Sequence, residues 1–201
     1  MTQLRFPGVH AQADPGRVAI TMAGTGEQVT FGELDAISNR LARTFRSLGL
    51  EAGGHVATCM ENRVEVLEVA WGAHYAGLHY TFISTRLTPD EAAFIIGDSG
   101  SKVVVLTPQL GLVLMPALAG LVDDDVTFVS IGGEVDGADD LMALAAERSP
   151  DPIPDATEGA DMLYSSGTTG RPKGVLRALS GEPLGTTAGL ALLGEFLMGM
   201  S

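Results

Sequence analysis

The segment from Tyr164 to Val175 combines the residue types that can hold a polyphosphate. It reads Tyr-Ser-Ser-Gly-Thr-Thr-Gly-Arg-Pro-Lys-Gly-Val. Glycines let a backbone turn sharply and approach a ligand, and successive N–H groups in such a turn form an anion-binding nest. Hydroxyls can donate to phosphate oxygens or ligate Mg²⁺, and a lysine adds a mobile positive charge. The predicted phosphate-binding residues are Ser165, Ser166, Gly167, Thr168, Thr169, Gly170 and Lys173, with Thr168 also a candidate Mg²⁺ ligand.

A surface hairpin and a Walker-type loop are the two alternative interpretations of this segment. Glycine, serine and threonine are ordinary turn residues, so a plain surface hairpin would have a similar composition. Lysine usage favours a binding loop, because the chain has ten arginines but only two lysines, Lys102 and Lys173. A Walker-type loop is excluded, because that motif places Ser or Thr directly after Gly-Lys, whereas here Lys173 lies between Pro172 and Gly174.

The same segment resembles the phosphate-loop signature of the adenylate-forming superfamily, which includes acyl-CoA synthetases, luciferases and peptide-synthetase adenylation domains. The match runs through Ser166-Gly167-Thr168-Thr169-Gly170 and then Pro172-Lys173-Gly174, with Ser165 where threonine is commoner. Further similar segments cover nearly the whole chain. They are Val29–Leu34 with Asn39, Gly77–Thr81, Arg86–Thr88 with Glu91, and Asp98–Gly100. The residues around Tyr80 are closer to those of acyl-CoA synthetases than to those of peptide-synthetase domains.

This resemblance implies an acid–thiol ligase that converts a carboxylic acid, ATP and CoA to acyl-CoA, AMP and pyrophosphate. It implies ATP, Mg²⁺ and a carboxylic acid as ligands, with CoA as co-substrate. The likeness to acyl-CoA synthetases favours a fatty acid as the carboxylic acid. The family's adenine, ribose and acyl-pocket motifs and its catalytic lysine come later than these 201 residues. We therefore expect the chain to be the N-terminal portion of such a ligase, to contain no catalytic residue, and to be inactive alone.

Strand-like and helix-like patterns alternate along the chain and predict an α/β fold. Strands are expected at 18–22, 55–60, 78–83, 103–106, 126–131, 161–165 and 174–177, and helices at 30–48, 62–75, 88–97, 108–121, 138–148 and 185–200. This order predicts a mostly parallel sheet with helices on both faces. The resemblance places it in the first part of the large N-terminal domain of adenylate-forming enzymes. Residues 1–50 would belong to an incomplete second subdomain, and 51–201 to an α/β subdomain ending with the phosphate loop (165–174) and a helix.

Three helix starts carry local capping signals. Thr30 with Glu33, Asn62 with Glu65, and Thr88 with Glu91 each have the spacing of a capping box. In the helix from 62, we expect Val66, Leu67, Ala70, Trp71 and Tyr75 to point inward.

Composition limits the partners of the chain. A net charge of −13 argues against nucleic acid and anionic membranes as broad-surface partners. The single cysteine, Cys59, cannot form an internal disulfide and indicates a reducing compartment, so we expect a cytoplasmic protein. No 18-residue apolar run predicts a membrane span, and the first residues do not form a secretory signal.

Alternative functions remain open at this level. The chain could be a truncated, non-catalytic fragment that oligomerises or binds a partner, or a separate nucleotide-binding module. One helix presents an apolar stripe of Leu34, Ile37, Leu41, Phe45 and Leu48, and the tail from Leu184 to Met200 is also apolar. The resemblance implies that the part of the large domain that packs on residues 1–50 comes after these 201 residues, so we expect this helix to lose its neighbour. We then expect a homodimer that covers both apolar faces.

Overall fold

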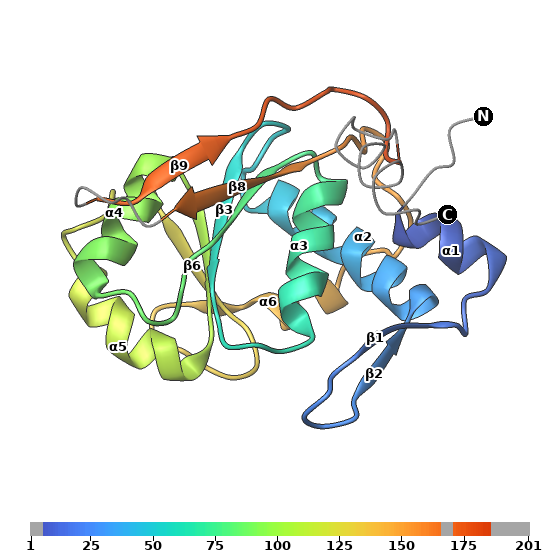
Figure 1. Cartoon of the computed structure of the whole chain (residues 1–201), viewed down its shortest axis with the longest axis horizontal. Helices are drawn as coiled ribbons and strands as arrows, with labels where there is room; N and C mark the ends of the chain where they lie inside the picture. The colour runs from blue at the N-terminus through green and yellow to red at the C-terminus, as the bar shows by residue number, and fades with distance from the viewer. Residues whose placement is uncertain (1–5, 166–170, 186–201) are drawn as a thin grey trace.

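The computed structural model describes residues 6–165 and 171–185 of the chain (Figure 1). The helices are α1 (Pro7–Ala13), α2 (Phe31–Ser47), α3 (Glu65–Tyr75), α4 (Pro89–Ser99), α5 (Pro108–Leu118) and α6 (Leu141–Ala146). The strands are β1 (Val18–Thr21), β2 (Gln28–Thr30), β3 (His55–Cys59), β4 (His79–Phe82), β5 (Val103–Leu106), β6 (Thr127–Ser130), β7 (Asp139–Asp140), β8 (Ala160–Ser165) and β9 (Lys173–Leu176). The predicted helix at 185–200 lies almost entirely outside the described residues.

Seven strands form one sheet in the order β7-β6-β5-β3-β4-β8-β9. Every neighbouring pair is parallel except β8 and β9, which are antiparallel at one edge. Strands β1 and β2 form a separate antiparallel hairpin. The α/β fold with a mostly parallel sheet is therefore confirmed.

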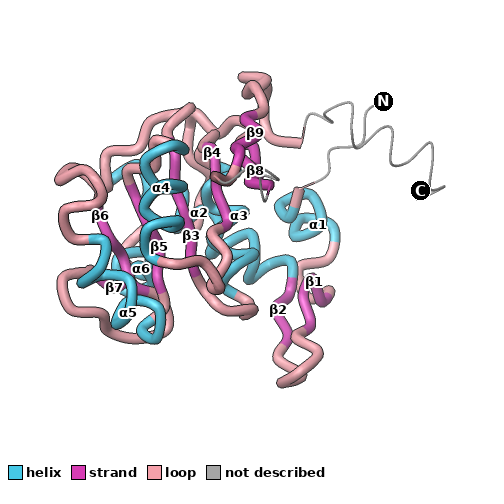
Figure 2. Tube along the Cα trace, turned by 60° about the vertical axis from the view of Figure 1, so that its left-hand side comes forward, coloured by secondary structure: helices cyan, strands magenta, loops and turns pink. Residues whose placement is uncertain are grey.

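Helices cover both faces of this sheet. On one face, the side chains of Val103 and Val105 join a core with residues of α2, α3 and α6. On the other face, Val104 and Leu106 pack with residues of α4 and α5. Figure 2 shows the central strands lying between these two groups of helices. Strand β5 is buried along its whole length, as expected for a parallel strand covered on both sides.

The helix starts confirm two of the three predicted caps. The Thr30/Glu33 and Thr88/Glu91 pairs each form a complete capping box. The Asn62/Glu65 cap is wrong, because α3 begins after Val64 with no side-chain cap, and Glu65 instead forms an ion pair with Arg63.

The predicted inward face of α3 is also wrong in part. Leu67 is 45% exposed, whereas Glu68 is only 9% exposed and lies among the buried residues of the helix. The small residues Gly72 and Ala73 face inward and allow α3 to pack closely against α2.

The apolar stripe of α2 is covered within this chain. Leu34, Leu41 and Phe45 are buried in the core, and Ile37 and Leu48 pack against it. The expectation that this stripe loses its neighbour is therefore wrong, because α3 and α6 pack on α2. The homodimer prediction depended on two exposed apolar faces. The α2 stripe is covered within the chain, and the tail from Leu184 to Met200 lies mostly outside the described residues. The dimer and the subdomain division at residue 50 stay predictions.

Two single features complete the description of the fold. Cys59 is buried in β3, and burial raises the pKa of its thiol to about 11, so it is an unreactive core residue. Among the described residues, no helix has the length and apolar character required to cross a membrane.

Candidate phosphate-binding site

The two described ends of the predicted phosphate loop lie side by side. Ser165 ends β8, Lys173 begins β9, and the two residues are direct partners in the antiparallel pair. Side chains of such partners leave the sheet on the same face with Cβ atoms about 5 Å apart. Both residues are exposed. The other predicted phosphate-binding residues, including the candidate Mg²⁺ ligand Thr168, lie outside the described residues (166–170).

The hairpin places this loop at the carboxyl edge of the parallel sheet. Strand β8 runs parallel to β4, with His79 opposite Ala160 and Tyr80 opposite Asp161, so Ser165 lies at the carboxyl end. Ligands of open α/β sheets bind outside the carboxyl ends of the strands. The predicted loop is therefore at the edge where this fold class binds its ligands.

The strand that enters the loop is fixed to α4 through Tyr164. The Tyr164 hydroxyl donates a 2.6 Å hydrogen bond to Oδ2 of Asp98. Partial burial and the Asp98 carboxylate raise the pKa of Tyr164, so its hydroxyl stays a donor. Gly174 leaves room for the ring, because a Cβ at that position would lie 2.9 Å from Cζ of Tyr164.

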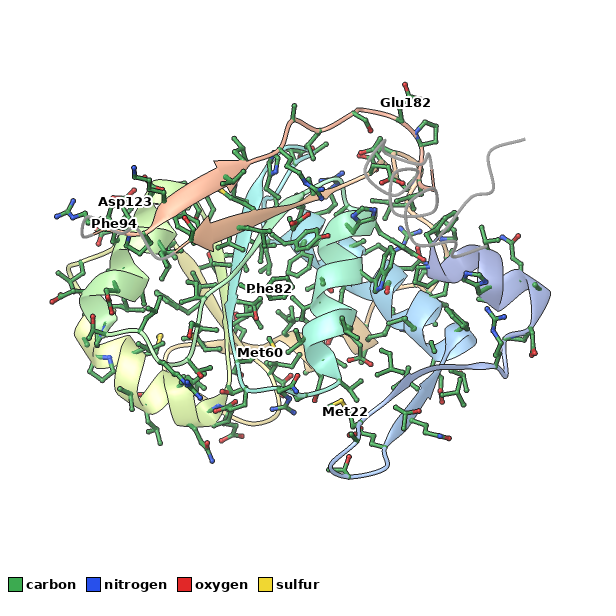
Figure 3. All side chains as sticks on the ribbon, in the orientation of Figure 1. Met22, Met60, Phe82, Phe94, Asp123 and Glu182 are labelled. Atoms are coloured by element: carbon green, nitrogen blue, oxygen red, sulfur yellow. The ribbon has the colours of Figure 1, made fainter. Side chains whose placement is uncertain are left out.

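The other end of the loop also meets α4. The guanidinium carbon of Arg171 lies 5.1 Å from the ring centroid of Phe94, within cation–π range. Figure 3 shows Phe94 at the α4 end of the hairpin. Sequence reasoning missed both contacts, because their partners are far apart in the chain.

The two lysines of the chain differ in their surroundings. Lys102 forms ion pairs with Asp125 at 2.6 Å and Asp123 at 3.8 Å. Among the described residues, no carboxylate forms an ion pair with Lys173. Lys173 can therefore offer its charge to a ligand, whereas Lys102 is already committed to carboxylates.

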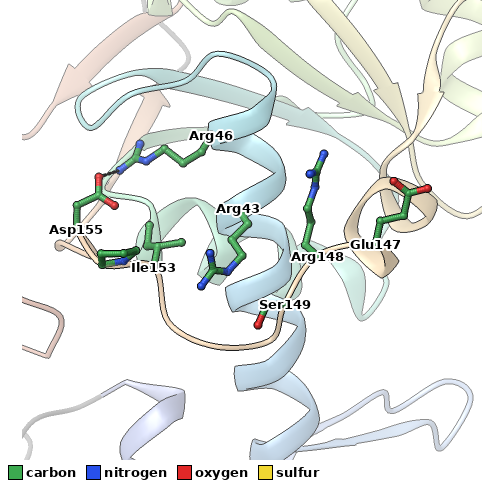
Figure 4. A pocket seen from close by; sticks show the side chains of 8 residues that line it. Arg43, Arg46, Glu147, Arg148, Ser149, Ile153 and Asp155 are labelled. Atoms are coloured by element: carbon green, nitrogen blue, oxygen red, sulfur yellow. Dashed lines mark hydrogen bonds and ion pairs between the residues drawn. The ribbon is translucent and has the colours of Figure 1, made fainter.

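A pocket of about 420 Å³ lies elsewhere, between α2 and the segment that leads into β8 (Figure 4). Two arginines that line this pocket already donate hydrogen bonds to oxygen atoms of the protein. Arg43 donates to the carbonyls of Asp151 and Pro152, and Arg46 donates to the carbonyl of Leu50 and pairs with Asp155. These arginine contacts attach the segment before β8 to α2.

Comparison with known proteins identifies the family. The sequence profile described as AMP-binding enzyme matches residues 9–180, most of the chain. The chain belongs to the AMP-binding enzyme family. The matched range includes α2, the parallel sheet and the phosphate-loop hairpin, so the resemblance seen in the loop extends through the fold.

Relatives within the AMP-binding family include CoA ligases. The chain is 34% identical over 170 residues to long-chain-fatty-acid–CoA ligase FadD13 of Mycobacterium tuberculosis, covering 83% of the chain and 33% of the ligase. An inhibitor-bound N-terminal domain of FACL13 from Mycobacterium tuberculosis matches with a TM-score of 0.69 and 30% identity, covering 85% of the chain and 42% of that structure. ATP-bound MatB from Rhodopseudomonas palustris matches with a TM-score of 0.65 and 30% identity, covering 85% of the chain and 34% of MatB. The chain thus spans about a third of the length of the curated relatives it matches.

Proposed function

We propose that the chain supplies the ATP phosphate-binding part of an acyl-CoA synthetase. The observation that carries this proposal is the pairing of Ser165 with Lys173, which forms no ion pair with a described carboxylate, at the carboxyl edge of an AMP-binding fold. Lysine charge and hydroxyl donors beside a glycine-rich connection fit a polyphosphate. The reaction is the conversion of a carboxylic acid, ATP and CoA to acyl-CoA, AMP and pyrophosphate, with a fatty acid as the favoured substrate because fatty-acid ligases are among the relatives.

The role of the loop in this proposal is electrostatic. Its N–H groups, the hydroxyls of Ser165, Ser166 and Thr169, and the Lys173 ammonium bind the β- and γ-phosphates while the acid's carboxylate attacks the α-phosphorus. The same donors stabilise the negative charge of the leaving pyrophosphate. Mg²⁺, when bound, neutralises phosphate charge, and Thr168 is the hydroxyl we assign to it. The fit rests on the exposed Ser165 hydroxyl beside the Lys173 ammonium, which no carboxylate in residues 6–165 and 171–185 pairs with.

Titration with pyrophosphate tests the proposal on the chain itself. We expect millimolar binding, a free energy on the order of 4 kcal/mol, with amide shifts at Gly167–Gly170 in NMR spectra. Lys173→Ala should weaken this binding about tenfold, because it removes the cation paired with Ser165 across the two strands. Lys102→Ala is the matched control, since it makes the same change in net charge where the lysine is already paired with Asp125. Absence of shifts in the wild type, or equal losses in both variants, would contradict phosphate binding at this loop.

A further inference from the structure

Helix α4 contacts the phosphate loop at both of its ends. Tyr164, just before the loop, donates its hydroxyl to Asp98 at 2.6 Å. Arg171, at the far end, places its guanidinium over the ring of Phe94 at 5.1 Å. Phe94 and Asp98 are four residues apart in one helix, so they lie on the same face and act from the same rigid element.

The hairpin is shaped to accept these contacts. Gly174 is the partner of Tyr164 across the antiparallel pair, and a Cβ there would approach the Tyr164 ring within 3.0 Å. The ring itself packs against the core beside α4. Strand β9 also contacts α4 directly (Figure 1). Both stems therefore have a fixed place relative to the helix.

We propose that Asp98 and Phe94 of α4 are positioning residues for the phosphate loop, acting through Tyr164 and Arg171. This inference rests on the proposed function. A hydrogen bond to a carboxylate is among the stronger kinds, and the stacked guanidinium adds a second attachment at the other end. Fixing both stems limits the conformations of the connection between them. An anion that binds at this loop then loses less conformational entropy, because Ser165 and Lys173 already have fixed positions.

Variants of α4 can separate this role from general stability. Asp98→Ala removes the acceptor of the Tyr164 hydroxyl, whereas Asp98→Asn keeps a side-chain oxygen that can accept the same bond. Phe94→Leu keeps an apolar side chain but removes the aromatic face under Arg171. Asp90→Ala is the control, because Asp90 is exposed in the first turn of the same helix and forms no hydrogen bond or ion pair with the described part of the hairpin.

Two measurements on the 201-residue chain decide the question. We expect Asp98→Ala and Phe94→Leu to weaken pyrophosphate binding about fivefold each, and Asp98→Asn and Asp90→Ala to stay within about twofold of the wild type. Hydrogen exchange at the amides of Lys173 and Gly174 should speed up in Asp98→Ala and stay unchanged in Asp90→Ala without any ligand.

The outcomes distinguish the two proposals. If the wild type binds pyrophosphate and Asp98→Ala binds it equally well, the positioning role is overturned while phosphate binding stands. If Asp98→Ala and Asp98→Asn lose binding equally, the Tyr164 hydrogen bond is not the cause and the positioning role is likewise overturned. If the wild type binds no pyrophosphate, the proposed function fails and positioning fails with it. In that case, faster exchange in Asp98→Ala would show that the Tyr164–Asp98 hydrogen bond stabilises the sheet and has no role in anion binding.

Discussion

Glu68 places a carboxyl group among the buried residues of α3. It is 9% exposed, and burial, followed by the nearby charges of Glu65 and Glu27, raises its pKa to about 7. The folded state therefore keeps a proton that the unfolded chain, with a pKa near 4.5, gives up at lower pH. Stability from this group is fully present below pH 4.5 and is lost as pH rises towards and through 7.

Replacing this acid with its amide should therefore stabilise the protein at high pH. We expect Glu68→Gln to raise the free energy of unfolding by on the order of 2 kcal/mol at pH 8 and to change it little at pH 4. Urea unfolding at the two pH values measures the difference, and Glu51→Gln, at an exposed glutamate, is the control. An equal effect of Glu68→Gln at both pH values would show that folding does not shift the pKa of this carboxyl.

At the residue scale, the phosphate loop could be found from sequence because its signal is local. Glycines, hydroxyls and a rare lysine lie within a few consecutive residues. The contacts that anchor its stems could not be found in this way. Tyr164 and Asp98 are 66 residues apart, and a tyrosine or an aspartate alone does not specify its partner.

At the scale of elements, helices α2 and α3 pack closely against each other. Gly72 of α3 faces Leu41 of α2, and a Cβ at Gly72 would lie 2.5 Å from Cβ of Leu41. Leu41 is fully buried, so neither side chain can move into solvent. The distance between the two helices therefore depends on the absence of a side chain at Gly72.

We expect Gly72→Ala to lower the free energy of unfolding by about 1–3 kcal/mol, because the added methyl group forces the helices apart. Gly97→Ala in α4 is the matched control, since a Cβ there meets nothing within 4 Å. That control should raise stability by up to about 1 kcal/mol through helix propensity. Thermal or urea unfolding compares the two variants, and a stabilising Gly72→Ala would show that the α2–α3 contact is looser than described.

The helices also show which element features sequence can predict. Capping boxes at α2 and α4 involve residues three apart, and both were found. The orientation of α3 was partly wrong, because its residues are apolar around most of the helix and give no single apolar stripe. Close packing against α2 then selects the side with Gly72 and Ala73, and this brings Glu68 inward and leaves Leu67 outside.

At the scale of the whole molecule, a pair of histidines connects fold stability to pH, with His79 buried and His55 partly buried. His55 and His79 are partners on β3 and β4, with ring centroids 4.6 Å apart. Burial lowers the pKa of both, and the charge of His79 lowers that of His55 further. The unfolded chain therefore takes up protons first, so stability from this pair is present above about pH 6.5 and is lost as pH falls below it.

We expect the wild type to lose stability between pH 7 and pH 5 relative to a His55→Gln/His79→Gln variant, whose pH profile should be flatter. Urea midpoints at several pH values measure the slopes. His10→Gln provides the control, because His10 lies on α1 away from this pair. Parallel profiles for the wild type and the double variant would show that neither ring is kept neutral by the fold.

A further prediction at the scale of the whole molecule concerns the catalytic activity of the chain by itself. Residues 1–201 span about a third of the related ligases, so we expect them alone to release no pyrophosphate in response to carboxylic acids. A pyrophosphate-release assay with an acid panel measures this, with the Mycobacterium tuberculosis ligase as positive control. Acid-dependent release above that of Lys173→Ala would contradict the expectation.

The antiparallel pairing of β8 and β9 has a consequence for how this scaffold can change. Because Ser165 and Lys173 face each other, the intervening residues leave the sheet and return to it at one point. A short Asn-Gly turn could join strands in that register, so the sheet does not depend on the length or chemistry of the connection. The sheet and the residues that connect β8 to β9 can therefore change independently. A descendant of this chain could exchange or lose its loop and keep the same architecture, so shared architecture alone does not establish a shared reaction.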